Sequence, residues 1–325
     1  MKLPDPTNPL DGEAASEAFE LLLDGGVDDA DVRDFLLAMS LRDETAIEIA
    51  AAIRAIRVRM IGVKAPANAI DVCGTGGDMS NSLNVSTAVA IVVAACGVPV
   101  AKHGNRAASS QAGGADTLEA LGLDLDRASE NAEATLADLG IAFLFAQKHH
   151  PALVRLAPIR RSIARRTIFN LTGPACNPAG VTRQLIGVAR PDFLRVYADA
   201  LLLLGMDNVM LVAGDEPLDE LSVGGPSTML RIGHAPERIR PEDVGIERHP
   251  LVALRGGDAR YNADALGRLV LGDTGAYRDA VLLNAGAALL VAGEVATIRD
   301  GIEEAAEALD KGLAKALLDC WIAYK

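Results

Sequence analysis

Short apolar segments alternate with amphipathic segments through the middle of this chain, and this alternation limits the folds open to it. Five short segments rich in Val, Ile or Leu and bounded by turn residues are typical of strands; they lie at residues 69–75, 98–104, 141–146, 183–189 and 208–215. Helical patterns follow four of them, at residues 84–97, 114–122, 149–163 and 192–205, and the tail is helical from about Tyr277. Parallel strands joined by crossover helices give this pattern. We therefore expect an α/β fold with a mainly parallel central sheet flanked by helices.

The N-terminal part of the chain follows a different pattern. Three amphipathic helical segments cover residues 13–26, 29–43 and 44–60, and no strand pattern interrupts them. Residues 62–69 read as a linker. We expect a small helical domain at residues 1–64 and a larger α/β domain at residues 65–325. The arginine-bearing helical segment from about residue 148 to 168 is expected to return and complete the helical domain.

Charge and composition exclude several classes of protein. The formal net charge is −13, whereas a general nucleic-acid-binding protein needs a basic face. No apolar signal-peptide core precedes the first helical segment, and the longest wholly apolar run, residues 88–101, is too short to span a bilayer. The cysteines are scattered without a CxxC pair, which argues against a zinc site or a disulfide framework; they are Cys73, Cys96, Cys176 and Cys320. We expect a cytoplasmic protein that binds neither nucleic acid nor membrane.

Two stretches of the chain carry positive charge without any acidic residue. Residues 79–115 contain none, and neither do residues 139–191, although the whole chain has 44 Asp and Glu residues. The second stretch contains Lys148, Arg155, Arg160, Arg161, Arg165, Arg166, Arg183 and Arg190. A buried sheet explains the uncharged part of the first stretch but not an arginine-rich segment. The distribution favours a compact anionic ligand.

A glycine-rich turn, "DVCGTGGDMSNSLNVSTA" at residues 71–88, joins an expected strand to an expected helix. A helix N-terminus after such a turn is a ready anion site. A dinucleotide site requires GxGxxG and an acidic residue at the end of the next strand, but here the spacing is GxGG and the next strand ends in Lys102 and His103. A P-loop GxxxxGK[ST] is absent from the turn. The pattern favours phosphate over a dinucleotide, and a purely structural turn is the alternative at this point.

Five motifs together resemble the anthranilate phosphoribosyltransferase family. They are the glycine-rich turn, "KHGNRAASSQAGGADTLEALG", "FAQKHHPAL", "RRTIFNLTGPACNPAG" and "LDEL", in the family's order and spacing over nearly the whole chain. The resemblance implies transfer of a phosphoribosyl group from phosphoribosyl pyrophosphate (PRPP) to anthranilate, with release of pyrophosphate. It also implies two Mg²⁺ ions and a homodimer formed through the helical domain.

The resemblance carries over to individual positions of this chain. Those matching the family's PRPP contacts are Gly74, Gly77, Asp78, Ser82, Asn84, Val85, Ser86, Thr87, Lys102, His103, Gly104, Asn105, Arg106, Ala107, Ala108, Ser109, Ser110 and Gly114. Those matching its anthranilate contacts are Gly74, His103, Asn105 and Arg160, and those matching its metal ligands are Ser86, Asp219 and Glu220. We assign no general base, because an arylamine has little need of a strong one.

The chain departs from the family pattern at four positions. Met79 and Ala164 stand where glycines are usual, and Ser82 and Cys176 replace threonines. None removes a ligand-type side chain, so the expected effect is on loop mobility. A pyrimidine nucleoside phosphorylase, the nearest alternative, would carry lysine and serine where Cys73 and Thr75 stand. The low aromatic content, 3%, disfavours a non-catalytic relative that binds nucleic acid.

Overall fold

A single mixed sheet forms the centre of the protein. The computed structural model describes residues 2–107, 111–216 and 218–325, and in these ranges seven strands have the order β3-β2-β1-β4-β5-β6-β7. The parallel strands are β1 (Ile70–Gly74), β2 (Val100–Gly104), β3 (Ile141–Phe145), β4 (Arg183–Gly187) and β5 (Asn208–Gly214). Two antiparallel strands, β6 (Ser227–Arg231) and β7 (Glu237–Ile239), complete one edge. The predicted mainly parallel sheet is confirmed.

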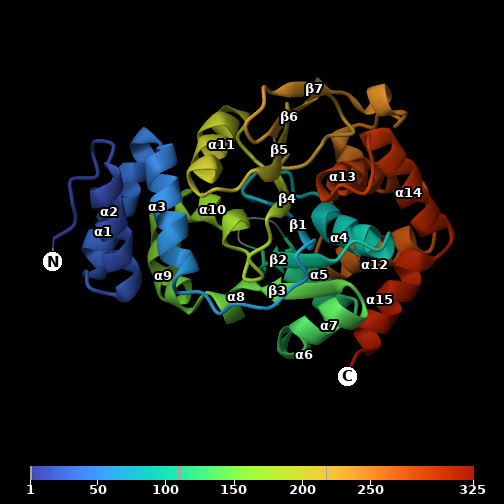
Figure 1. The fold of residues 1–325 in the computed structure, drawn as a ribbon, viewed down its shortest axis with the longest axis horizontal. Helices are drawn as coiled ribbons and strands as arrows, with labels where there is room; N and C mark the ends of the chain where they lie inside the picture. Colours follow the sequence, from blue (N-terminus) through green and yellow to red (C-terminus); the bar gives the residue numbers. More distant parts are fainter. Residues whose placement is uncertain (1, 108–110, 217) are drawn as a thin grey trace.

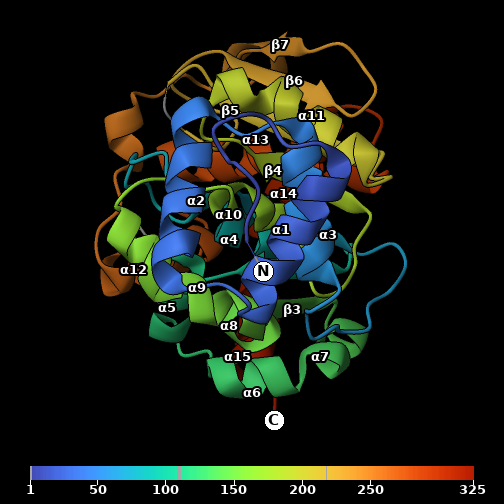
Figure 2. The ribbon, with the colours of Figure 1, turned by 90° about the vertical axis from the view of Figure 1, so that its left-hand side faces the viewer.

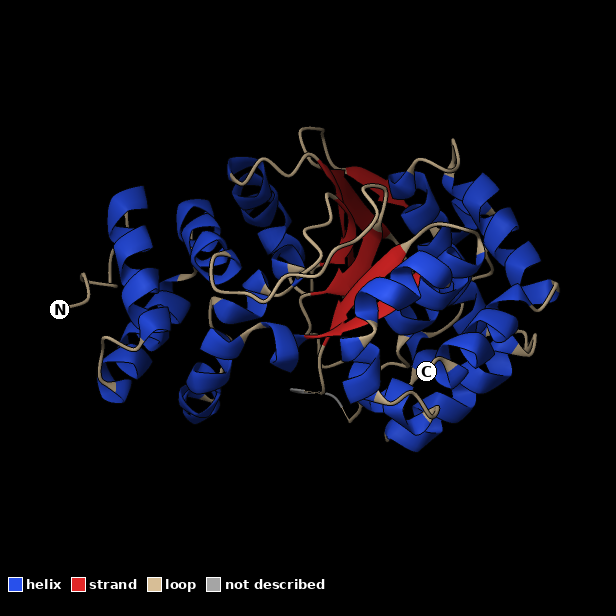
Figure 3. Cartoon of the chain, turned by 60° about the horizontal axis from the view of Figure 1, so that its bottom comes forward, coloured by secondary structure: helices blue, strands red, loops and turns tan. Residues whose placement is uncertain are grey.

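Helices cover both faces of this sheet (Figures 1 and 3). On one side of the sheet lie α1 (Gly12–Asp24), α2 (Asp29–Arg42), α3 (Ala46–Arg57), α9 (Pro151–Ile163), α10 (Phe169–Thr172) and α11 (Leu194–Leu203). On the other side lie α4 (Val85–Ala95), α5 (Gly114–Ala120), α12 (Ala259–Val270), α13 (Ala276–Ala292), α14 (Ile298–Asp310) and α15 (Leu313–Ala323). Three short helices, α6 (Leu125–Glu130), α7 (Ala132–Asp138) and α8 (Ala146–His149), flank β3. In the described ranges no helix is long and apolar enough to cross a membrane.

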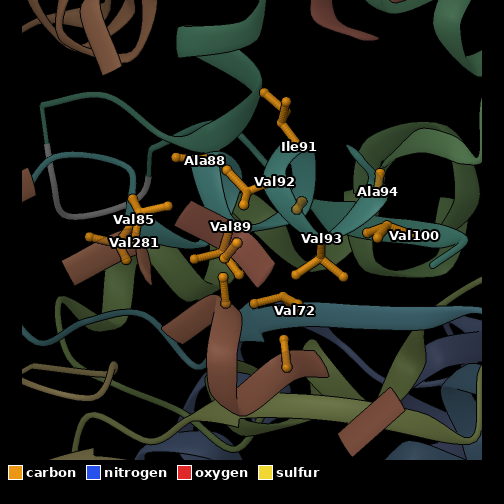
Figure 4. Packing of buried hydrophobic residues seen from close by; sticks show 14 of the residues in the cluster. Val72, Val85, Ala88, Val89, Ile91, Val92, Val93, Ala94, Val100 and Val281 are labelled. Atoms are coloured by element: carbon orange, nitrogen blue, oxygen red, sulfur yellow. The ribbon is translucent and has the colours of Figure 1, made fainter. Parts of the chain in front are cut away.

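The alternation of side chains along each strand divides the core between the two helical layers. Val72 of β1 and Leu185 of β4 are buried with α4 and α13, whereas Cys73 and Ile186, one residue later, are buried with the N-terminal helices. Figure 4 shows the valines of α4 gathered against β1 and β2. Because both faces are covered, the strands are almost wholly apolar, and this is why the sequence pattern identifies them.

The N-terminal helices are defined by local capping signals and meet α9 in space. Asp11 caps α1, and Thr45 and Glu48 form a capping box at the start of α3. Leu156 of α9 is buried in the same cluster as Phe19 of α1, and Figure 2 shows α9 beside α1 and α2. These contacts support the predicted return of residues 148–168 to the helical domain. The boundary between residues 64 and 65 stays a prediction.

The structure differs from the expected elements in three places. The segment expected as one helix at residues 149–163 is broken at His150, because Pro151 disfavours a helical residue before it and begins α9 instead. The expected helix at residues 44–60 ends at Arg57. The sequence pattern missed β6 and β7, which are partly exposed, and also the helices α6, α7, α10 and α12.

Ala164 ends α9 in the left-handed conformation, with φ +53°. An L-residue pays about 1–2 kcal/mol there, while glycine loses about 0.4–1 kcal/mol more entropy on folding. We therefore expect Ala164→Gly to stabilise the protein by about 0.5–1 kcal/mol, seen as a rise of roughly 1–2 °C in Tm.

The matched control for this prediction is Gly293→Ala at the end of α13. Gly293 has φ +82° and no atom within 4 Å of an added Cβ, so only backbone strain changes and Tm should fall. A lower Tm for Ala164→Gly would show that strain at residue 164 is not the dominant effect.

Candidate active site

The carboxyl ends of β1 and β4 form the centre of the site. The chain proceeds from β1 to β2 on one side and reaches β4 on the other, so the strand order reverses between β1 and β4. Ligands of open α/β sheets bind at such a switch point. Asp219 crosses both strand ends: a Cβ on Gly74 would lie 2.1 Å from Asp219 Oδ2, and one on Gly187 would lie 1.5 Å from Asp219 O. Only glycine at both ends admits this segment.

Three carboxylates converge beside the glycine-rich loop. Asp219 Oδ2 accepts a hydrogen bond from Gly76 N at 2.8 Å. Burial, and then the neighbouring carboxylate of Asp78, raise the pKa of Asp219 above its usual range. Burial and the charge of Asp219 likewise raise the pKa of Glu220, which faces the backbone N–H of Ser86. Asp219 and Glu220 are partly buried, and their raised pKa values favour protonation when no cation is bound. Carboxylate oxygens are also the ligands that Mg²⁺ prefers. Ser86 lies beside Glu220, the neighbour of Asp219, so the predicted metal ligands are near one another. Among the described residues no group of three or more His, Cys, Asp or Glu side chains is arranged to hold a metal ion, and the metal site stays a prediction.

The glycine-rich loop has a left-handed backbone at four positions. Gly76 and Gly77 have φ +67° and +82°, and Met79 and Asn81 have φ +57° and +50°. Met79 therefore occupies a conformation that favours glycine, and its side chain is exposed. Ser82 forms an isolated bridge with Arg255 and ties the end of the loop to the segment before α12. The loop presents its backbone to the carboxylates at one end and is anchored at the other.

Lys102 lies buried at the end of β2. Its Nζ donates to Val72 O at 2.8 Å and to Ser86 Oγ at 3.4 Å. Its charge partly offsets the burial of Asp71 and Glu220. Lys102 thus places positive charge beside the start of α4, where the predicted phosphate contacts Ser86 and Thr87 lie.

Asn84 precedes α4 and is held by protein groups on several sides. Its Oδ1 accepts from Thr117 Oγ1 and from Asn262 Nδ2, the latter at 2.9 Å, and its Nδ2 donates to Ala112 O at 3.2 Å. Its backbone O accepts from Tyr277 OH at 3.2 Å. Among the described residues Asn84 Nδ2 donates to Ala112 O alone, and the structure gives Asn84 a linking role that the sequence did not predict.

The loop after β2 is organised around Asp116. Asp116 accepts from Ala107 N and Gly113 N, each at 2.9 Å, and pairs with Arg106 at 2.9 Å. The guanidinium of Arg106, predicted as a PRPP contact, is thus engaged by α5. Asn105 is exposed.

Two glycines of this region are required by close packing. A Cβ on Gly104 would lie 2.6 Å from the Phe143 ring, and one on Gly114 would lie 2.9 Å from Thr87 Oγ1. The two positions therefore keep β2 and α5 close to their neighbours. The predicted contacts Ala108, Ser109 and Ser110 lie outside the described residues.

His103 pairs with His150 inside the protein. Their Nε2 atoms are 3.2 Å apart, and Nδ1 of His103 lies 3.1 Å from Gly173 O, which requires a proton on that nitrogen. Burial and the neighbouring histidine lower the pKa of His103 to about 3, and burial lowers the pKa of His150 to about 4. Both rings are neutral at physiological pH. His103 therefore lines the site without offering a proton at neutral pH.

This pair makes stability depend on pH. Both histidines are neutral in the folded protein but titrate near pH 6.5 in the unfolded chain. Their contribution to the free energy of unfolding is therefore fully present above pH 6.5 and is lost as the pH falls. We expect His150→Asn to reduce the loss of unfolding free energy by about 1.4 kcal/mol per pH unit between pH 6 and 4.5. Urea denaturation at several pH values measures how the free energy of unfolding depends on pH. His234→Asn, at an exposed turn, is the control, and equal slopes for His150→Asn and the unmodified protein would contradict the neutral pair.

Arg160 lies near the end of α9 with its guanidinium 5.8 Å from the centre of the Phe169 ring. Burial lowers the pKa of this guanidinium. Within the part of the chain that the structure describes, no carboxylate pairs with Arg160 and no hydrogen bond satisfies its side chain. A partly buried cation with that environment is suited to an anionic group from a ligand.

Sequence reasoning missed several residues that support the site. They are Asp71, Thr117, His150, Asn262, Tyr277 and Asn284. A polar residue inside an otherwise apolar segment was the available signal for two of them. Asp71 stands within a buried strand, and Asn284 stands within the apolar helix "VLLNAGAALL".

Comparisons with known proteins agree with this geometry and with the resemblance found in the sequence. Residues 66–315 match the a/b domain of a glycosyl transferase family, and residues 5–60 match that family's helical bundle domain. An anthranilate phosphoribosyltransferase of Novosphingobium aromaticivorans is 59% identical over 324 residues, covering 99% of this chain and 98% of its own length. One from Sphingopyxis alaskensis is 60% identical over 325 residues, with the same coverage.

Solved structures lead to the same family. The crystal structure of anthranilate phosphoribosyltransferase from Thermus thermophilus has a TM-score of 0.93 and 41% identity, covering 98% of this chain and 96% of its own. The enzyme from Saccharomyces cerevisiae in complex with PRPP and Mg has a TM-score of 0.88 and 28% identity, covering 97% and 93%. The chain therefore belongs to the same glycosyl transferase family as these anthranilate phosphoribosyltransferases.

Proposed function

We propose that this chain transfers the phosphoribosyl group of PRPP to the amine of anthranilate and releases pyrophosphate, in tryptophan biosynthesis. The bond from the anomeric carbon to the pyrophosphate oxygen breaks, and a bond from that carbon to the amine nitrogen forms. The observation that supports this most is the position of Asp219 at the switch point, where it accepts a hydrogen bond from the Gly76 N–H and lies near Asp78 and Glu220. The named relatives carry the same activity in their names.

The pyrophosphate and phosphate groups are assigned to the glycine-rich loop and the start of α4. The N-terminus of this 11-residue helix favours anions, and Lys102 adds a full positive charge beside it. Ser86 and Thr87 present hydroxyls at the same place. These groups would hold PRPP before and during departure of the pyrophosphate.

Magnesium would be held by Asp219, Glu220 and Ser86. When bound, the ion supplies positive charge that neutralises the leaving pyrophosphate. We infer two ions, because the family resemblance implies two. A Mg²⁺ complex is described for the Saccharomyces cerevisiae relative.

Anthranilate is assigned to the side of the site that faces α9. Arg160 would pair with its carboxylate, while the neutral His103 and the backbone at Gly74 and Asn105 would line the aromatic ring. A relative from Saccharomyces cerevisiae is described in complex with 4-fluoroanthranilate. With the carboxylate fixed, the amine is held in line with the anomeric carbon, and such positioning supplies much of the rate.

The direct test follows the fluorescence of anthranilate. Adding PRPP and Mg²⁺ to the full chain should consume the signal, and omitting either one should leave it unchanged. An absence of turnover by folded protein would refute the proposal.

We also infer a cytoplasmic homodimer that associates through the helical domain. Large apolar side chains are exposed there, including Val58 at 82% and Leu41 at 66%. Sedimentation of the full chain at micromolar concentration tests the dimer, and Val58→Glu should shift it towards monomer.

A further inference from the structure

Asn284 lies in the middle of α13, completely buried among apolar side chains. Asparagine is a poor residue for a helix interior, and a buried carboxamide must find partners for both N–H groups and its oxygen. Asn284 finds all of them. Its Nδ2 donates to Leu221 O at 3.0 Å and to Ala280 O at 2.9 Å, and its Oδ1 accepts from Leu221 N at 2.9 Å.

The two bonds to Leu221 act on a segment that has no strand partner. Residues 218–222 run between β5 and β6 without regular secondary structure, so no ladder fixes their backbone. The carboxamide of Asn284 pairs with the N–H and the C=O of one residue, as a neighbouring strand would. Leu221 itself is fully buried. The clamp therefore sets the position of the backbone directly after Asp219 and Glu220.

Asp219 is also held from the opposite side. Its side chain accepts from Gly76 N, and its backbone passes over the ends of β1 and β4 where only glycines admit it. The two carboxylates thus lie between one anchor on the glycine-rich loop and another on α13. Loss of the second anchor would remove the two hydrogen bonds that fix the backbone directly after Glu220.

The same face of α13 supports the other half of the site. Tyr277, seven residues before Asn284 and so on the same side of the helix, donates to Asn84 O at the start of α4. One rigid helix thus fixes the spacing between the predicted phosphate contacts and the predicted metal carboxylates.

We propose that Asn284 is a positioning residue that holds Asp219 and Glu220 in the arrangement that binds a divalent cation. This rests on the metal assignment of the proposed function. Asn284 contacts no predicted substrate or metal group, since its partners are Leu221 and Ala280. No other standard side chain of this size both donates to a C=O and accepts from an N–H without carrying charge.

The test measures the binding of Mn²⁺ to the full chain without substrates, using electron paramagnetic resonance. Loss of a group that orients metal ligands typically weakens metal affinity about 10–100-fold, and we expect this of Asn284→Ala. Hydrogen exchange at the Leu221 amide should become faster in the same variant. If Asn284→Ala folds poorly, Asn284→Ser leaves space for water beside Leu221 and carries the same expectation.

Two further variants separate the possible outcomes. Arg278 is also on α13 and forms an ion pair with Asp310 of α14. Arg278→Met removes this ion pair, so it controls for a general loosening of α13 and should leave the affinity for Mn²⁺ unchanged. Asp219→Asn/Glu220→Gln should abolish Mn²⁺ binding. If it binds as well as the unmodified protein, the metal assignment itself is wrong. If it loses binding while Asn284→Ala and Asn284→Ser retain full affinity, the positioning role alone is wrong.

Discussion

Asp219→Asn/Glu220→Gln is expected to lower kcat/KM at least about 1000-fold and, without metal, to raise Tm. Removing metal-mediated stabilisation of the leaving group costs several kcal/mol, and about 4 kcal/mol corresponds to 1000-fold. The stability gain has a separate cause. Both carboxyl groups are partly buried beside each other and have raised pKa values, so neutral amides of the same shape remove an unfavourable charge from the metal-free protein.

The opposite signs of the two effects make this prediction informative. A variant that lost activity through misfolding would have a lower Tm. Asp215→Asn, in the acidic pair four residues earlier, is the control. Asp215 forms an exposed ion pair with Arg238, which contributes little to stability, so activity and Tm should both stay close to those of the unmodified protein. Activity of the double variant within tenfold of the original would refute the metal assignment. The measurements are steady-state kinetics at saturating Mg²⁺ and calorimetry in chelator.

The strands that could be predicted from sequence are those buried on both faces. β1 to β5 are short apolar runs because helices cover them on each side. β6 has only two buried residues, Ser227 and Leu230, and β7 has only three residues in all, so neither contrasts with a loop. A strand could therefore be predicted from the sequence when it lies in the covered part of the sheet, and not when it lies at the exposed edge.

The arginine-rich stretch shows where sequence reasoning about the site reaches its end. Its charge excess favoured an anionic ligand, but the structure gives several of these residues protein partners. Arg166 pairs with the buried Glu44, and Arg190 pairs with Asp43, while both guanidinium groups lie over the Phe193 ring. These acids come from the turn between α2 and α3, far away in sequence. No spacing rule could have separated these arginines from Arg160.

The sequence also could not show which segments, far apart along the chain, lie against one another in the site. The sequence predicted an anion site at the glycine-rich loop, and the resemblance predicted Asp219 as a metal ligand. That Asp219 crosses Gly74 and Gly187 depends on the order of β1 and β4 in the sheet. The clamp by Asn284 depends likewise on how α13 packs beneath residues 218–222.

Arg160→Ala is expected to raise the KM for anthranilate about 30–150-fold while changing the KM for PRPP less than about threefold. Hydrogen bonds between a guanidinium and a carboxylate contribute about 2–3 kcal/mol when they are shielded from water. Arg160 is partly buried, and in the described ranges its guanidinium contacts the Phe169 ring and no carboxylate. The ligand carboxylate would be its partner, so the loss falls on that substrate.

Two further variants on α9 make the test of Arg160 specific. Arg161→Ala removes the adjacent arginine, which is exposed, and should leave both KM values unchanged. Arg160→Lys keeps the charge but not the planar pair of donors, so its KM for anthranilate should lie between those of Arg160→Ala and the unmodified protein. A larger change in the KM for PRPP would show that the two substrates occupy opposite ends of the site from those assigned. Because an unpaired buried cation destabilises the substrate-free protein, Arg160→Ala should not lower Tm, and this separates lost recognition from lost folding.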